Sequence, residues 1–347
     1  MGEPPSLATM PNELLKIIVE QAGYMSIQRL RLVNHAFQEF IENSKLDYSL
    51  KEISIQLLFD QVSLTLKQGK ASDVIVYKQH EQGTEIQIGS LRVVKKEVNF
   101  LDLFFDVLKD IFKNQISTIG KLNIELIREW GSDWKEQFLH ANNSFVKRLQ
   151  EMEGPEGQEQ WRVSMIRVAA SHDHTKEIIS MVDPNYLNRI EFVCNWNRLN
   201  RNNSEEIIDL VQWKSAKELY CLMGYCQGFR RLDVTKFSHF EKMEVNITTV
   251  TANELHQLIK SYIENPNFKS SVILYKNYQG NEPIDYIRAR MAQNRYGQLE
   301  EEVECYYRIP YSDYALFHFF SKKRSRFARI PLSRVPPNVV LADAKNL

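Results

Sequence analysis

The sequence has 347 residues, enough for two domains or for a small module and a large one, and 43% of them are hydrophobic. Lysine plus arginine equal aspartate plus glutamate at 44 each, so no net positive field favours nucleic acid or an anionic membrane as partner. No stretch reaches the roughly 18 consecutive apolar residues of a membrane-spanning helix. We therefore expect a globular protein with a substantial core and no membrane partner.

The sequence shows no signal peptide and no cysteine pattern typical of a disulfide framework or a zinc site. The sequence begins Met-Gly-Glu-Pro-Pro, which is acidic and has no apolar core, so we expect no signal peptide. The cysteines are too few and too scattered for a disulfide framework, and no second Cys or His pair stands at zinc-binding spacing. They are Cys194, Cys221, Cys226 and Cys305. We expect reduced thiols, no metal ion, and a cytoplasmic or nuclear location.

The first forty residues predict two or three short helices. A helix should begin near Pro11, because proline fits the first helical turn. From Leu14 apolar residues recur at three- and four-residue spacing, and Gly23 is a typical residue to end the helix. A second apolar series with the same period runs from Ser26 to Ile41. A unit of this size cannot bury enough apolar surface to stand alone, so we expect a partner or a neighbouring domain to hold it.

These residues also follow a spacing that can be compared with a known motif. They are Leu7, Met10, Pro11, Glu13, Leu14, Ile18, Leu30, Arg31, Leu32, Val33 and Phe37. The pattern resembles the F-box motif, with Met10 in place of the usual Leu and Phe37 in place of a common Trp, and both exchanges keep an apolar side chain of similar reach. The alternative is an ordinary helical cap on the following domain, which would need neither Leu-x-x-Met-Pro before the helix nor an Arg in the second apolar stripe.

The resemblance implies a partner. In F-box proteins this element binds a Skp-type adaptor, which links it to a cullin scaffold. The residues that the resemblance assigns to adaptor binding are Leu7, Met10, Pro11, Leu14, Leu15 and Ile18, with Leu30 and Val33 in support. We expect them to bury apolar side chains in a groove of the adaptor, as a helix does in other helix-in-groove complexes.

Residues 44–120 predict a linking region with a hairpin and a buried helix. Asp73–Tyr77 and Thr84–Ile88 have the composition of strands, and the polar loop between them ends in Gly83. Phe100–Phe112 is apolar on more than one face, which predicts a buried helix.

From Lys121 onward, short strands are each followed by a polar loop and usually by a helix. Their centres lie near Ile124, Ile166, Ile190, Leu219, Val245 and Ile273. The last four intervals are about 24 to 29 residues, which is within the spacing of leucine-rich repeats, but the regular Leu-x-x-Leu-x-Leu pattern is missing. We therefore predict an α/β fold in which a small three-helix module at residues 6–43 precedes an irregular leucine-rich-repeat-like α/β solenoid at 121–335, with a flexible tail at 336–347.

A second set of motifs lies in this region. It comprises Phe240–Val245, Asn253–Leu255, Ile259, Asn267–Phe268, Ile273 and Arg308–Phe320. These segments resemble the FTH domain, which follows the F-box in the F-box A family of nematodes, and they come in that family's order. The resemblance implies that the region binds a target protein.

No group of residues points to catalysis. Ser171–His174 gathers titratable side chains, but its two histidines have no third ligand nearby, and Asp173 fits the N-cap of the helix that follows. We find no glycine-rich phosphate loop, nucleophile elbow or paired-carboxylate spacing. We therefore expect a non-catalytic protein with no catalytic residue and no cofactor.

The favoured hypothesis is a substrate adaptor of a Skp-cullin-F-box ubiquitin ligase, which holds an unknown target near the ligase and performs no chemistry itself. A non-degradative F-box scaffold is one alternative. Nucleic-acid binding through the basic strand at Lys322–Arg326 and Arg329 is the weaker one, because basic and aromatic residues that alternate along a strand more often form its solvent and core faces.

Overall fold

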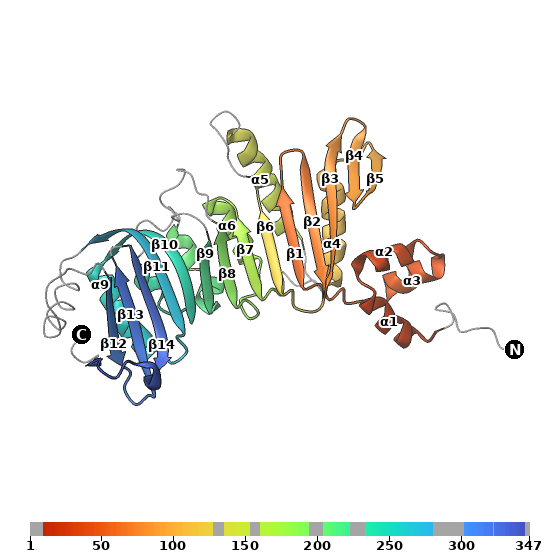
Figure 1. Cartoon of the computed structure of the whole chain (residues 1–347). Helices are drawn as coiled ribbons and strands as arrows, with labels where there is room; N and C mark the ends of the chain where they lie inside the picture. Colours follow the sequence, from red (N-terminus) through yellow and green to blue (C-terminus); the bar gives the residue numbers. More distant parts are fainter. Residues whose placement is uncertain are drawn as a thin grey trace. The chain divides into compact units, whose positions relative to one another are not determined.

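A computed structural model describes residues 10–127, 135–152, 160–193, 204–222, 233–279, 302–321 and 323–343. In these residues the protein is of mixed α/β type, with short helices first and then strands and further helices (Figure 1). The chain divides into two units. The first comprises Met1–Ala170 and His174–Leu187, and the second comprises Ser171–Asp173 and Asn188–Leu347.

The first unit begins with the helices α1 (Asn12–Gln21), α2 (Tyr24–Arg31) and α3 (His35–Asn43). Helix α1 starts after Pro11, as predicted, and the Leu15 N–H donates to the Pro11 carbonyl at 3.0 Å. Asn34 caps α3, because its side-chain oxygen accepts a hydrogen bond from the Phe37 N–H. Gly23 separates α1 from α2 with a φ of 84°, in the left-handed region that glycine adopts readily.

The core of these helices is shared with the chain that follows them. The buried residues of the helices are Leu15, Val19, Tyr24, Ile27, Phe37 and Ile41. Tyr24 packs edge-on against Tyr48, with 5.2 Å between the ring centroids, and Tyr48 lies beyond the last helix. The helical module is therefore completed by its neighbour, as its small size led us to expect.

Seven strands form the sheet of the first unit. They are β1 (Glu52–Leu57), β2 (Gln61–Gln68), β3 (Ala71–His80), β4 (Gly83–Ile88), β5 (Leu91–Lys96), β6 (Lys121–Glu125) and β7 (Met165–Ala169). Their order is β7-β6-β1-β2-β3-β4-β5. Neighbours from β1 to β5 are antiparallel, whereas β1 and β6, and β6 and β7, pair in parallel. The predicted hairpin corresponds to β3 and β4, and the structure extends it to a five-stranded meander.

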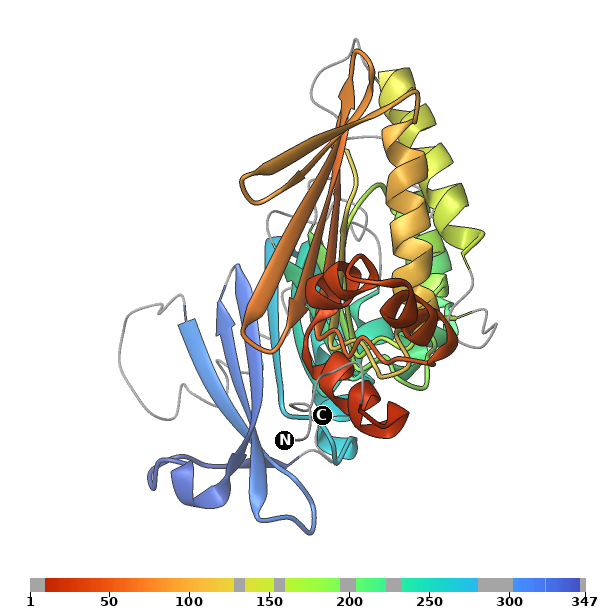
Figure 2. The same cartoon turned by 90° about the vertical axis from the view of Figure 1, so that its right-hand side faces the viewer.

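Helices cover one face of this sheet (Figure 2). They include α4 (Phe100–Asn114) and α5 (Lys135–Gln150), and α4 contacts β2, β3 and β4. Phe104 of α4 packs against Tyr77 of β3 and stacks on Phe145 of α5 at 5.7 Å between centroids. Helix α4 is the predicted buried helix, because most of its apolar residues are buried. Helix α6 (His172–Ser180) follows β7.

The second unit contains parallel strands followed by antiparallel ones. Its elements are β8 (Arg189–Val193), α7 (Ser204–Ile208), α8 (Val211–Ser215), β9 (Glu218–Leu222), η4 (Val234–Phe237), β10 (Lys242–Thr251), α9 (Ala252–Glu264), β11 (Ser270–Gln279), β12 (Glu302–Arg308), β13 (Tyr314–Ser321), β14 (Arg324–Pro331), η5 (Leu332–Arg334) and β15 (Ala342–Asp343). The strand order is β15-β12-β13-β14-β11-β10-β9-β8. Strands β8 to β11 pair in parallel, and β11 continues into the antiparallel set through β14.

The strands predicted from the repeating pattern are present as β6 to β11. Helix α9 carries the predicted capping box, in which the Thr251 hydroxyl accepts from the Glu254 N–H and the Glu254 carboxylate accepts from the Thr251 N–H. The structure therefore confirms a mixed α/β chain with a large sheet. It does not confirm the leucine-rich-repeat-like solenoid, which stays a prediction.

One expectation about the cysteines is wrong. Cys221 in β9 forms a disulfide bond, so it is not a reduced thiol. Cys305 is free, and burial raises the pKa of its thiol to about 11. Spacing along the chain does not reveal which thiols meet in space, so this bond could not be predicted from the positions of the cysteines.

Candidate functional site

Helix α1 is apolar on two faces, and the residues that the structure describes bury one of them and leave the other exposed. Leu15 and Val19 point into the core, and Leu15 is only 6% exposed. Leu14, 53% exposed, and Ile18, which is also exposed, lie four residues apart on the outer face, with Ile17 beside them. A solvent-facing apolar stripe on a short helix is unusual unless another surface covers it.

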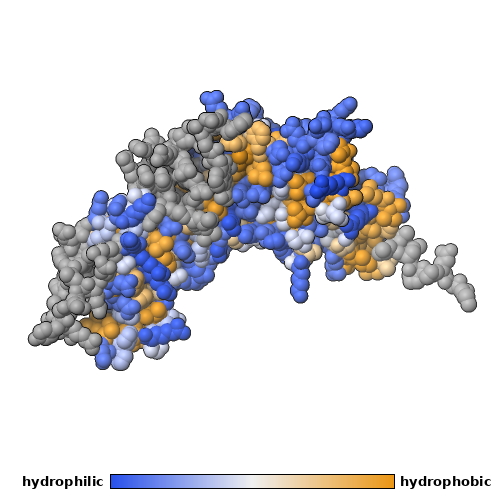
Figure 3. Space-filling view, turned by 45° about the horizontal axis from the view of Figure 1, so that its top comes forward, coloured by the Kyte–Doolittle hydropathy of each residue, from blue (hydrophilic) through white to orange (hydrophobic). Residues whose placement is uncertain are grey.

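The turn after α2 adds two more exposed apolar side chains. Leu32 is 87% exposed and Val33 is 63% exposed. Together with Leu14, Ile17 and Ile18 they form what we call the exposed apolar set. Figure 3 shows hydrophobic surface gathered over the N-terminal helices.

The structure places the predicted adaptor-binding residues in three kinds of position. Leu14, Ile18, Val33 and Pro11 are exposed, Met10 and Leu30 are partly buried, and Leu15 is buried. Leu7 lies outside the described residues. Ile17 and Leu32 belong to the same surface but were not selected from the sequence, although Ile17 stands three residues from Leu14 and could have been found by that spacing.

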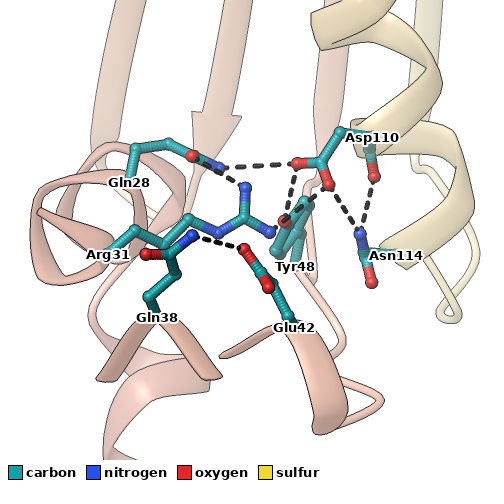
Figure 4. A network of polar contacts seen from close by, with 7 residues as sticks. All are labelled: Gln28, Arg31, Gln38, Glu42, Tyr48, Asp110 and Asn114. Atoms are coloured by element: carbon teal, nitrogen blue, oxygen red, sulfur yellow. Dashed lines mark hydrogen bonds and ion pairs between the residues drawn. The ribbon is translucent and has the colours of Figure 1, made fainter. Parts of the chain in front are cut away.

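A polar network centred on Asp110 joins α2 to α4 (Figure 4). Nη2 of Arg31 lies 3.4 Å from Oδ1 of Asp110, and the Gln28 amide donates to Oδ2 at 3.5 Å. The Tyr48 hydroxyl donates to Oδ2 at 2.8 Å, and the Asn114 amide donates to Oδ1 at 3.1 Å. Arg31 also donates to the Gln28 side-chain oxygen at 3.1 Å, so the guanidinium is held at two points.

The surroundings of Tyr48 and Arg31 shift the pKa values of both side chains. Burial, and then the charge of Asp110, raise the pKa of Tyr48, so its hydroxyl stays a neutral donor. Burial opposes the charge on Arg31, but Tyr48 and Asp110 outweigh it and raise the pKa of the guanidinium. Tyr48 therefore stays neutral and Arg31 stays charged across the physiological pH range.

A second junction is centred on Asp47, just after α3. Its carboxylate accepts hydrogen bonds from the backbone N–H groups of Ser49 at 3.0 Å, Ile116 at 3.1 Å and Ser117 at 3.2 Å. Burial raises the pKa of Asp47, but the bonds from Ser49 and Ser117 prevail and lower it. The segment after α3 is thereby fixed to the end of α4.

The end of α1 is fixed in the same way. The Glu20 carboxylate accepts from the Asp47 N–H at 3.0 Å, and the Gln68 amide at the end of β2 donates to the Glu20 carbonyl at 3.0 Å. These contacts and the Asp110 network join the three helices to the sheet of the first unit. These bonds therefore orient the exposed apolar set relative to the sheet.

The titratable cluster at Ser171–His174 lies at the start of helix α6. Helix α6 begins at His172, so Asp173 lies in its first turn and is not the N-cap that we expected. His174 is buried with its Nε2 2.6 Å from the Asn143 side-chain oxygen. Among the residues that the structure describes, no group of three or more His, Cys, Asp or Glu is placed to hold a metal ion.

Exposed basic residues alternate with buried residues in the first half of strand β14, as its sequence indicates. Arg324 and Arg326 of β14 are exposed, whereas Ser325 and Phe327 between and after them are buried. Arg329 donates to the carbonyls of Pro266 at 2.8 Å and Asn265 at 3.1 Å, just past the end of α9. It therefore satisfies helix-end carbonyls, which is a structural role.

None of the helices in the described ranges has the length and hydrophobicity needed to cross a bilayer.

Comparison with protein families gives two matches. A family model for the F-box domain matches residues 7–49, which include the three helices and both Asp47 and Tyr48. A family model for the FTH domain matches residues 144–288. The searches of curated proteins and of solved structures gave no match. F-box domains typically bind Skp-type adaptors and generally belong to non-catalytic adaptor proteins of ubiquitin ligases. The chain thus has the architecture that its motifs predicted, an F-box domain followed by an FTH domain.

Proposed function

We propose that this protein is a substrate adaptor of a Skp-cullin-F-box ubiquitin ligase. The observation that carries the proposal is the exposed apolar set, which lies on the element that matches the F-box. Leaving several large apolar side chains in water on so small a module is costly, and burial against an adaptor would relieve that cost.

The proposed adaptor-binding residues fall into two roles. Leu7, Met10, Pro11, Leu14 and Ile18, with Leu30 and Val33 in support, contact the adaptor, and the exposed Ile17 and Leu32 extend the same surface. Leu15 acts from beneath, because it is buried and holds the helix that presents Leu14 and Ile18.

The mechanism in this proposal is positional. The F-box connects through the adaptor to a cullin, and the FTH domain, which we propose to be an irregular α/β solenoid, binds a target protein. Holding the target near a ubiquitin-charged enzyme raises its effective concentration there, and the protein itself forms and breaks no bond. We propose that this takes place in the cytoplasm or the nucleus.

The test is co-purification with a Skp-type adaptor. We expect a Leu14→Asp/Ile18→Asp double variant to lose the adaptor, because each change places a charge in an apolar interface. Leu139→Asp on α5 is the matched control, since Leu139 is an exposed apolar helix residue outside the F-box. Equal recovery of the adaptor with the wild type and the double variant would overturn the proposal.

A further inference from the structure

Strand β5 is an open edge of the sheet in the first unit. It stands last in the strand order, and all six of its residues are exposed. Three of them are apolar, with Leu91 59% and Val93 47% exposed and Val94 exposed beside them. Proteins normally protect such edges, because the unpaired backbone groups of an edge strand are a template for another strand. Figure 1 shows β5 beyond β4 at the end of the meander.

The register with β4 shows which backbone groups face outward. Leu91, Val93 and Lys95 stand opposite Ile88, Ile86 and Thr84 of β4. The loop between the strands is the two residues Gly89 and Ser90, which makes the first of these pairs hydrogen-bonded. Hydrogen-bonded pairs recur at every second residue along an antiparallel ladder. The Glu97 N–H donates to the Gln82 carbonyl at 2.9 Å, which fits this alternation.

Alternate residues of β5 therefore present their backbone groups at the free edge. These residues are Arg92, Val94 and Lys96, each with one N–H and one C=O directed away from β4. Among the described residues no strand pairs with this edge. Three donors and three acceptors at two-residue spacing match the requirements of an added strand.

The side chains of β5 indicate which charge an added strand should carry. Arg92, Val94 and Lys96 share one face, because side chains alternate along a strand. Lys95 adds a third positive charge, and β5 has no acidic residue. Nε of Arg92 lies 3.6 Å from a carboxylate oxygen of the partly buried Glu85. The Arg92 side chain is 67% exposed, so solvent weakens this pair and leaves the guanidinium accessible.

A second copy of this chain is a poor occupant of the edge in the register that centres on Val94. If two β5 strands paired antiparallel about Val94, Arg92 of one would stand directly opposite Lys96 of the other. Like charges directly opposite each other destabilise a strand pair. The same two positions favour a strand with acidic residues.

We propose that β5 binds an extended segment of a target protein as an added antiparallel strand. Acidic residues of the segment stand opposite Arg92 and Lys96, and a β-branched residue stands opposite Val94, which gives the pattern acidic-x-β-branched-x-acidic. The identity of the occupant as a target rests on the proposed function. The site lies outside the residues that match the FTH domain, so recognition extends into the region before it.

The first test uses the peptide Ser-Glu-Thr-Val-Thr-Glu-Ser and the full chain, with binding measured by fluorescence anisotropy. Val94→Pro removes one outward N–H, and we expect at least about tenfold weaker binding. Val94→Thr keeps the N–H and is the matched control, expected to bind like the wild type. Circular dichroism and thermal melting check that both variants fold. Equal affinity of a folded Val94→Pro variant and the wild type would overturn the added-strand geometry.

The second test reverses the charges and does not depend on the proline variant. An Arg92→Glu/Lys96→Glu variant should lose the acidic peptide and gain a peptide with Lys in place of both Glu. A variant that keeps the original preference would contradict the proposed register.

The third test locates the peptide by amide hydrogen exchange. We expect the amides of Arg92, Val94 and Lys96 to slow when the peptide binds, and those of Val93 and Lys95 to be slow already. Protection elsewhere with no change at these three amides would place the peptide at another site and overturn the proposal.

Adaptor co-purification separates this proposal from the proposed function. Val94→Pro should retain the Skp-type adaptor as the wild type does, because β5 and the F-box helices are different elements. Absence of adaptor from the wild-type preparation would count against the ligase function and leave the strand-addition result as it stands.

Discussion

At the scale of single residues, His318 is a buried histidine whose environment bears on stability. It is buried in β13, and its ring stacks on Phe327 with 4.2 Å between centroids. Neither ring nitrogen has a hydrogen-bond partner among the described residues. Burial lowers the pKa of His318 to about 3, because a charged imidazolium would lose its hydration there.

This residue should make stability depend on pH. The unfolded chain binds a proton at His318 below a pKa of about 6.5, whereas the folded chain stays neutral down to about 3. The stabilising contribution is therefore complete above the unfolded pKa and falls by about 1.4 kcal/mol per pH unit between those values as pH decreases. We predict that wild type loses about 2 kcal/mol more than His318→Phe between pH 7 and pH 5 in urea unfolding. The same pH dependence in both proteins would contradict the assignment.

At the scale of elements, the junction of α2 with α4 should contribute to stability. Asp110→Asn keeps the shape of the side chain but removes the charge that faces Arg31. We predict a loss of about 1 to 3 kcal/mol in the free energy of unfolding, and faster amide exchange in α1 to α3. Asp106→Asn, on the same helix at an exposed position, is the control and should change little. Equal effects of the two variants would mean that the network does not join the helices to the sheet.

The two apolar faces of α1 should separate stability from binding. Leu15→Ala removes a buried side chain, and we predict a cost of about 2 to 5 kcal/mol in urea unfolding. Leu14→Ala removes an exposed one and should change stability by less than about 0.5 kcal/mol while weakening adaptor binding. Loss of stability without loss of binding in Leu14→Ala would refute the assignment of the outer face.

Local patterns predicted much of what is local in this fold. Pro11 marked the start of α1, the apolar run at Phe100–Phe112 marked α4, and Thr251 with Glu254 marked the capping box. Each of these depends on residues close together in the chain. Strand β1 carries an equally local alternating pattern, Ile53, Ile55 and Leu57, which also marks a strand.

Other features depend on information that local patterns lack. Strand β5 has no buried face, so it has no hydrophobic alternation to detect. In the Asp110 network, the bonds from Gln28, Arg31 and Tyr48 to Asp110 join residues 62 to 82 positions apart, and no spacing rule covers that distance. The apolar period of α1 placed Leu14 and Leu15 on the same apolar stripe. Which of the two side chains faces the core is decided by packing against the rest of the fold.

At the scale of the whole molecule, the balance of charge bears on the nucleic-acid alternative. The formal net charge is zero, and Arg329 is already committed to helix-end carbonyls. We predict that filter binding of RNA at low and at physiological salt shows only weak binding. Tight binding that falls steeply with salt, and that is lost in Arg324→Ala/Arg326→Ala, would instead support the alternative.

The fate of the target distinguishes a ligase adaptor from a scaffold. Once a target is identified by proximity labelling, we predict that Leu14→Asp/Ile18→Asp lengthens its half-life without weakening its binding. The measurement is target turnover after translation is stopped, with Leu139→Asp as the control. A half-life that is unchanged by the double variant would favour the non-degradative scaffold.

The junctions at Asp47 and Asp110 have a consequence for which lysines can be modified. A target segment added at β5 and an adaptor bound at α1 would be held by the same unit of the chain, since polar bonds tie the F-box helices to its sheet and to α4. The distance between the adaptor on α1 and the target segment on β5 would then vary little. Only acceptor lysines at a matching offset from the bound segment would come within reach of the ubiquitin-charged enzyme, and lengthening that offset would move modification to other lysines.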